Sequence, residues 1–259
     1  MGDYLRLLTV NDRDIPLATL QRSVPSVAIW SVDHPGVLGN YLAIGPELGV
    51  LQNVWATIER NPVAPNTLGA EEVAEFIDSL DAGGPPSAVR WLADYLETIR
   101  AIYAIRIYPE AIVGQSDAED AVYSVRSALR SAVGGIGQWD GHGFTNEDDR
   151  LIWCDPRMVL KGKTEAAIQD ESSGEWIPFE LNLDDAEELS GFLRGELPKR
   201  FRQPRHVTPN GRNTRRPRPP SFPQWLPDRS GSRKSRGLSP SNRPAIVRRM
   251  EGRLHPSYR

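Results

Sequence analysis

The sequence predicts an α+β fold: a mixed, mainly antiparallel sheet with about four helices, followed by a disordered basic tail. Three observations lead to this prediction. Strand-like and helical segments do not alternate regularly, as they do in parallel α/β folds. Most large apolar residues of the 259-residue chain precede Pro198. The charge also changes sign near residue 199, which indicates two physically different segments.

The charge reversal sets the predicted domain organisation. Residues 1–198 carry 14 Lys and Arg against 32 Asp and Glu, a net charge of −18. Residues 199–259 carry 17 basic and 2 acidic residues, a net charge of +15. We therefore expect an acidic α+β domain over residues 1–198. A boundary near residues 61–67 is the alternative, and it would divide this domain into two subdomains. The remainder, 199–259, is an Arg- and Pro-rich segment that cannot bury enough apolar surface to fold.

Runs rich in β-branched and aromatic residues predict the strands. They lie at 4–10, 27–32, 41–44, 101–108, 136–140, 151–154, 164–169 and 176–181. Residues 50–58 have two interpretations. Their composition fits a strand, but a helical spacing is also present, formed by Leu51, Val54, Trp55 and Ile58.

Apolar periodicity and capping signals predict the helices. They cover 67–83, 85–99, 116–134 and 184–195, and residues 14–23 would allow a further short helix. Thr67 and Asp184 are the expected N-caps of the first and last of these helices. Ser116 and Glu119 have the spacing of a capping box, in which each side chain bonds a free backbone N–H of the first turn.

Several protein classes are disfavoured by composition. No uncharged apolar stretch approaches the roughly 20 residues that cross a bilayer. The start of the chain lacks the basic and apolar regions of a secretory signal, so we expect a cytoplasmic protein without a membrane partner. The chain has one cysteine, which excludes an internal disulfide and a cysteine-based zinc site.

Cys154 itself has two interpretations. It follows Ile152 and Trp153 in a strand-like run, and a free cysteine in such a position is typically a buried, inert thiol. The alternative is a catalytic nucleophile, which would need His142 or His34 brought close by the fold.

Residues 134–149 form the most suggestive stretch, because glycines, a histidine and four carboxylates lie between two predicted strands. As a catalytic loop, it would use His142 as a general base oriented by Asp140, with Glu147 as a third candidate. As a cation site, it would offer carboxylate oxygens to a hard metal ion. Its spacing matches no phosphate, calcium or zinc motif, so we assign no metal and no cofactor.

The same stretch also has two non-catalytic interpretations. As a protein-contact loop, its aromatic residues would be anchors. The binding candidates are then Trp139, Asp140, His142, Phe144, Glu147, Asp148 and Asp149. As a simple hairpin connection, its Gly, Asp and Asn residues would supply turn conformations and turn hydrogen bonds.

The basic segment 199–259 has three interpretations. Its arginine clusters would bind phosphate backbones without sequence preference. Pro217–Pro220 would form a polyproline helix for a partner groove. Of its 17 basic residues 15 are Arg, as expected for GC-rich coding, so it is alternatively an extension without a selected function.

No motif defines a reaction, and we therefore expect a cytoplasmic interaction protein. Its acidic domain would bind a basic protein partner, as an immunity-type inhibitor masks a toxin, because a strong field attracts oppositely charged surfaces. The alternative is a hydrolytic enzyme that uses the His142 and Asp140 loop. Nucleic-acid binding would involve the tail alone and is not expected.

Overall fold

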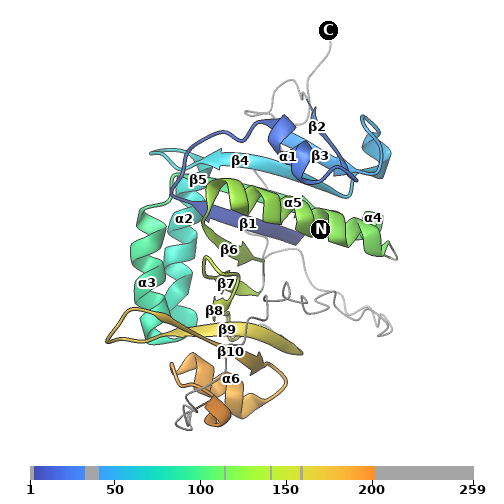
Figure 1. Cartoon of the computed structure of the whole chain (residues 1–259). Helices are drawn as coiled ribbons and strands as arrows, with labels where there is room; N and C mark the ends of the chain where they lie inside the picture. The colour runs from blue at the N-terminus through green and yellow to red at the C-terminus, as the bar shows by residue number, and fades with distance from the viewer. Residues whose placement is uncertain (1–2, 33–40, 114, 141, 158–159, 202–259) are drawn as a thin grey trace, which may run out of the picture. The chain divides into compact units, whose positions relative to one another are not determined.

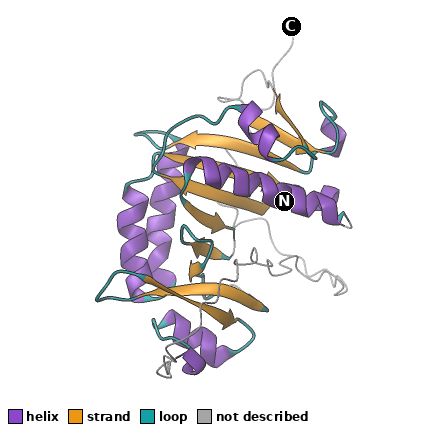
Figure 2. Cartoon of the chain, viewed as in Figure 1, coloured by secondary structure: helices purple, strands orange, loops and turns teal. Residues whose placement is uncertain are grey.

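The computed structural model describes residues 3–32, 41–113, 115–140, 142–157 and 160–201. These residues form an α+β fold around one ten-stranded mixed sheet, which confirms the predicted fold class (Figures 1 and 2). The strands are β1 (Asp3–Thr9), β2 (Ala28–Val32), β3 (Tyr41–Gly45), β4 (Ala56–Pro62), β5 (Ala101–Ile107), β6 (Ile136–Trp139), β7 (Gly143–Thr145), β8 (Leu151–Trp153), β9 (Lys163–Gln169) and β10 (Trp176–Asn182).

The first strand in the chain lies inside the sheet. The strand order is β10-β9-β8-β7-β6-β1-β5-β4-β3-β2. Neighbouring strands are antiparallel, with the exception of the parallel pair β8 and β9. In register, Leu5 of β1 lies opposite Ile105 of β5 and Trp139 of β6. Strand β1 therefore joins the two halves of the sheet.

Six α-helices lie within the described residues, two more than the sequence predicted. They are α1 (Leu17–Ser23), α2 (Leu68–Ser79), α3 (Pro86–Glu97), α4 (Pro109–Ile112), α5 (Ser116–Val133) and α6 (Ala186–Leu193), with 3-10 turns η1 (Leu51–Asn53), η2 (Leu80–Ala82) and η3 (Lys199–Phe201). Helix α1 is the short helix that residues 14–23 allowed. Helix α4 was missed because Pro109 is a stop signal for a strand but is equally suited to the first turn of a helix.

One face of the sheet packs against α1 and α5. Leu5 and Leu7 of β1 are buried there with Val125 and Leu129 of α5 and Leu20 of α1. The apolar residues of α5 recur at helical spacing, so that they form a continuous stripe over the sheet. Figure 1 shows α5 lying across β1.

The opposite face packs against α2 and α3. Because side chains alternate along a strand, Leu8 of β1 points away from Leu7. It is buried with Ile102 of β5, Val73 of α2 and Leu92 and Leu96 of α3. The sheet thus separates two apolar cores, and β1 contributes to both.

Three local expectations changed. Residues 50–58 contain the short 3-10 turn η1 followed by β4 from Ala56, so the strand interpretation holds for the end of the run and no helix spans Leu51 to Ile58. Helix α5 begins at Ser116 with Gln115 at its N-cap, so Ser116 occupies the first helical position and not the N-cap position that a capping box requires. Asp185, rather than Asp184, caps α6. Thr67 caps α2 as predicted, accepting a bond from the Ala70 amide.

The start of the basic segment is held by the fold. Lys199 and Arg200 form ion pairs with Glu187 and Glu188, and the Phe201 ring lies 6.0 Å from that of Phe179. Residues 202–259, the remainder of the predicted tail, lie outside the described residues. Within the described part of the chain, no helix combines the length and apolarity needed to cross a membrane.

The α5 stripe gives a stability prediction. Leu129 is 1% exposed, so Leu129→Ala should leave a cavity and lower the free energy of unfolding by about 2–5 kcal/mol. Ser127→Ala, at an exposed position of the same helix, should change it by less than about 0.5 kcal/mol. Urea unfolding followed by circular dichroism measures both. Equal losses in the two variants would contradict the packing of α5 on the sheet.

Candidate functional site

The suggestive stretch 134–149 contains more regular structure than the sequence indicated. It comprises β6, a short connection, β7 and the turn that leads to β8. Gly143 begins β7 with φ at 134°, and a Cβ there would lie 2.0 Å from the Trp153 carbonyl oxygen. A side chain at this position would therefore push β7 away from β8.

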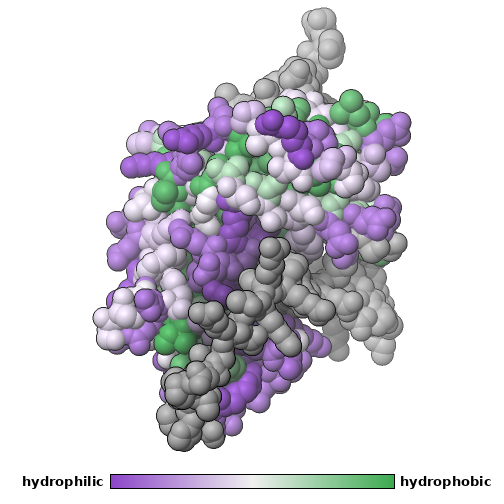
Figure 3. Space-filling view, in the orientation of Figure 1, coloured by the Kyte–Doolittle hydropathy of each residue, from purple (hydrophilic) through white to green (hydrophobic). Residues whose placement is uncertain are grey.

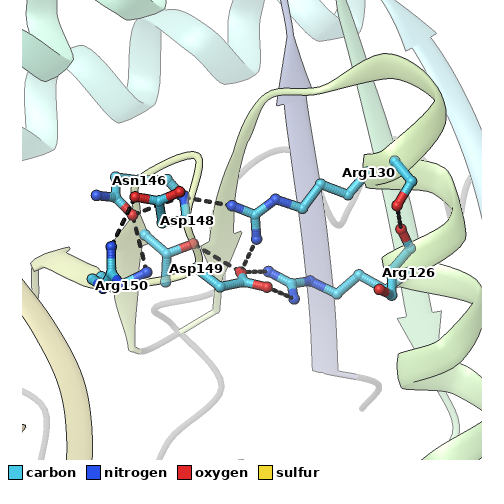
Figure 4. Close-up of polar contacts among 9 residues, drawn as sticks. Arg126, Arg130, Asn146, Asp148, Asp149 and Arg150 are labelled. Carbon is cyan, nitrogen blue, oxygen red and sulfur yellow. Dashed lines mark hydrogen bonds and ion pairs between the residues drawn. The ribbon is translucent and has the colours of Figure 1, made fainter. Parts of the chain in front are cut away.

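The Asp149 carboxylate is bound by two arginines of α5 (Figure 4). Arg126 donates two hydrogen bonds to it, at 2.9 and 2.5 Å, and Arg130 forms a further ion pair. Gly137 of β6 leaves room for this arrangement, since a Cβ there would lie 2.7 Å from Nη2 of Arg126. Burial alone would raise the pKa of Asp149, but the two guanidinium groups outweigh it and hold this pKa below its usual range.

Asn146 organises the turn that presents Asp149. Its side-chain oxygen accepts bonds from the amides of Asp148 and Arg150, each at 3.0 Å. Its carbonyl accepts a bond from Arg130 at 2.8 Å. Asn146 is 2% exposed, and Asp149 adopts a φ of 65°. The turn is thus fixed by its own backbone bonds and by α5.

The other three carboxylates of the stretch contact three different groups. Asp140 forms an ion pair with Arg6 of β1, and Asp148 pairs with Arg150 at 2.8 Å. Glu147 accepts a bond from the Tyr95 hydroxyl at 3.5 Å. Burial, with the Glu147 charge, raises the pKa of Tyr95 to about 12, so this phenol remains protonated at neutral pH.

The described residues do not gather these carboxylates around one point. No group of three or more His, Cys, Asp or Glu side chains within the described ranges has the geometry to hold a metal ion. Arginines already balance two of the carboxylates: Arg6 pairs with Asp140, and Arg126 and Arg130 pair with Asp149. The observed pairs fit the hairpin interpretation of the stretch better than the catalytic one.

The aromatic candidates are divided between the two faces of the sheet. Phe144 is 1% exposed and packs edge-on against Phe76 and Trp153, so it belongs to the core and is not available as a contact anchor. Trp139 is half-buried on the opposite face, 6.3 Å from the Tyr123 ring. The His142 ring lies 4.9 Å from Trp139.

Cys154 is a buried thiol. It is 1% exposed, and burial together with the Asp155 charge raises its pKa to about 12. The thiolate that a nucleophile requires is therefore scarce at neutral pH. His34, one of the two histidines considered as its partner, lies outside the described residues.

Sequence reasoning missed a row of alternating arginine and aromatic side chains on the α2 side of the sheet. The Arg106 guanidinium lies 5.3 Å from the centre of the Tyr108 ring and 5.9 Å from that of Tyr4. The Arg6 guanidinium lies 5.1 Å from the Tyr4 ring and 5.7 Å from the Phe76 ring. These distances permit cation–π attraction. The signal was the alternation in β1, where Tyr4 and Arg6 alternate with Leu5 and Leu7.

A cavity of about 360 Å³ lies at the Tyr108 end of this row. Ala43 of β3 and Thr57 of β4 line it from the sheet, and Leu51 and Gln52 of η1 line it from the preceding segment. Figure 3 shows apolar atoms at the upper right, over the segment between β3 and β4. Leu51 in that segment is 56% exposed.

The outer surface of α2 and α3 is strongly acidic. Residues 68–97 contain seven acidic residues and one basic residue, Arg90, which pairs with Glu171. Six of the acidic side chains are exposed: Glu71, Glu75, Asp78, Asp81, Asp94 and Glu97. The seventh, Glu72, turns inward and pairs with Arg6.

Comparison of the chain with protein family models, with curated proteins and with solved structures finds no match.

The Asp149 cluster predicts a pH-dependent stability. Because the folded pKa of Asp149 lies below its unfolded value of about 3.9, the cluster stabilises the fold above that pH and loses its effect as the pH falls further. Asp149→Asn should lower the free energy of unfolding at pH 7 by about 3 kcal/mol, since Arg126 is left buried without a counter-charge.

Asp148→Asn is the matched control, because this carboxylate is 64% exposed and also pairs with an arginine. It should cost less than about 1 kcal/mol. Urea unfolding at pH 7 and pH 3 measures both variants. If Asp149→Asn lowered the free energy of unfolding at pH 7 as little as the control does, the stability of the turn would not depend on these arginines.

The burial of Cys154 predicts an unreactive thiol. The native chain should fail to react with DTNB over hours at pH 8, whereas the chain unfolded in urea should release one equivalent of thiolate, since Cys154 is the single cysteine. Rapid reaction of the folded chain would instead support the nucleophile interpretation.

Proposed function

We propose that the acidic part of this chain is a cytoplasmic interaction domain that binds a basic protein partner, and that an immunity-type inhibitor is one instance of such a role. The acidic surface of α2 and α3 is the observation that supports it. Its exposed carboxylates lie on α2, on α3 and in the η2 turn between them, and the two helices pack side by side on one face of the sheet.

The α2 and α3 surface differs from the acidic residues elsewhere in the fold. In the stretch 134–149, three of the four carboxylates pair with arginines. On α2 and α3, Glu75, Asp78 and Glu97 are exposed, and no ion pair is found for them within the described residues. Such charges attract a cationic surface at long range and increase the association rate.

The hydrolytic alternative has less support. Its proposed base, His142, lies beside Trp139, and the carboxylate meant to orient it, Asp140, binds Arg6. A carboxylate already bound to a guanidinium group is less available to accept a hydrogen bond from a histidine and orient it.

A capture experiment with matched charge variants tests the proposal. The full chain, immobilised, should retain a basic protein from extract of its native cells in stoichiometric amount, and retention should fall steeply with salt because exposed charges are screened. The triple variant Glu75→Gln, Asp78→Asn, Glu97→Gln should retain at least about tenfold less, if each charge contributes about 0.5 kcal/mol.

The control variant removes the same number of charges elsewhere. Glu47→Gln, Glu165→Gln, Glu175→Gln alters three exposed carboxylates outside α2 and α3 and should retain the partner nearly as well as the unmodified chain. Absence of a stoichiometric partner, or equal losses in both triple variants, would contradict the proposed function.

A further inference from the structure

The cavity beside η1 has a lining suited to a particular ligand chemistry. Its polar groups are the hydroxyls of Tyr41, Tyr108 and Thr57, the Gln52 amide and the Glu110 carboxylate. None of the described residues that line it is Lys, Arg or His. Among these described residues the single formal charge is negative, and the neutral groups offer acceptor oxygens.

The tyrosines add a second preference for positive charge. The face of an aromatic ring is negative, so a cation near a phenol ring is attracted to it. Burial, with the nearby Tyr108 hydroxyl and the Glu59 carboxylate, raises the pKa of Tyr41. The Tyr41 phenol thus remains neutral at physiological pH. The two tyrosines offer hydroxyl oxygens and ring faces to a ligand.

The remaining lining is apolar. Ala43, Leu51, Val54 and Ala111 form the walls, and the two alanines leave space that larger residues would fill. Long basic side chains have an apolar stem and a charged end, and they bury the stem along apolar surface. The cavity volume lies at the lower end of the range for ligand sites, about 300–1,000 Å³.

Arg106 is a nearby positive charge that would repel a cationic ligand. Its guanidinium lies between the Tyr4 and Tyr108 rings, and it does not line the cavity. Glu110 in the lining and Glu59 beside Tyr41 together supply two negative charges against this one positive charge. The local balance therefore favours a cationic ligand over an anionic one.

We propose that this cavity binds a lysine or arginine side chain of the basic partner, with the stem against Ala43, Leu51 and Val54 and the charged end beside Glu110 and the two phenol rings. That the side chain comes from the basic partner rests on the proposed function. The preference of the cavity for a basic side chain rests on the lining of the cavity alone.

A titration with a small probe tests the cavity without the partner. The full chain, with its tyrosines labelled with carbon-13, is titrated with N-acetyl-lysine methylamide and followed by NMR. Signals of Tyr41 and Tyr108, assigned with Tyr→Phe variants, should shift and saturate. The norleucine analogue keeps the apolar stem but lacks the ammonium group, and it should bind at least about fivefold more weakly.

A charge variant and its control identify the contribution of Glu110. Glu110→Gln should weaken lysine-probe binding by about fivefold, whereas Glu175→Gln, which removes an exposed charge outside the lining, should leave it unchanged. Absence of saturable shifts at Tyr41 and Tyr108, equal binding of the norleucine analogue, or equal losses in the two variants would overturn the proposal.

The two proposals fail separately. If the probe binds but no partner is captured, the proposed function is contradicted, and so is the partner as the source of the side chain. The preference of the cavity for lysine is then still supported. Capture of the partner without probe binding contradicts the cavity proposal alone. When both succeed, Glu110→Gln should also weaken partner capture, and unchanged capture would exclude the partner as donor.

Discussion

The position of β1 is the constraint on which the rest of the fold depends. An interior strand covered on both faces has to supply apolar residues to two cores, and β1 does so with Leu5 and Leu7 on one face and Leu8 on the other. Arg6, on the same face as Leu8, carries charge into a face that is largely apolar. Glu72 and Asp140 balance that charge, and the Tyr4 and Phe76 rings cover the guanidinium. The packing of α2, the end of β6 and the arginine–aromatic row all converge on this one strand.

Local signals in the sequence predicted much of the fold. In several helices and strands, the apolar periodicity ends where glycine or proline residues indicate the end of the element. Helix α5 shows a stripe of Val122, Val125 and Leu129 before two glycines, and it lies where the spacing placed it. The ambiguous run 50–58 divided between η1 and β4, since the strand begins where pairing with β5 begins. Neither the order of the strands nor the parallel pair β8 and β9 could be predicted, because both depend on contacts between residues distant in the sequence.

The candidate site was harder to predict than the fold. Glycine, histidine and carboxylates in 134–149 are equally typical of a turn and of a catalytic loop, and their partners lie elsewhere in the chain. Arg126 and Arg130, which bind Asp149, are on a helix that ends before the stretch begins. The alternation of side chains along β1 would have sufficed to predict that Tyr4 and Arg6 lie on one face, where they meet Arg106. The cavity beside them could not be predicted in this way, because its lining comes from β3, β4 and η1. The charge difference between the two segments indicated an acidic surface, and six exposed acidic residues lie on α2, η2 and α3.

The interior place of β1 also has a consequence in time. Its partners β5 and β6 follow it by about 100 and 130 residues, so at a synthesis rate of about 5–20 residues per second it waits at least about 5–20 seconds before its first partner emerges. During that interval a strand with three leucines has no neighbour to pair with. A nascent chain therefore exposes this apolar strand to aggregation until β5 is synthesised, and assembly of the sheet depends on slow, long-range pairing. A variant that delays β5 would be expected to reduce yield before it alters any property of the folded domain.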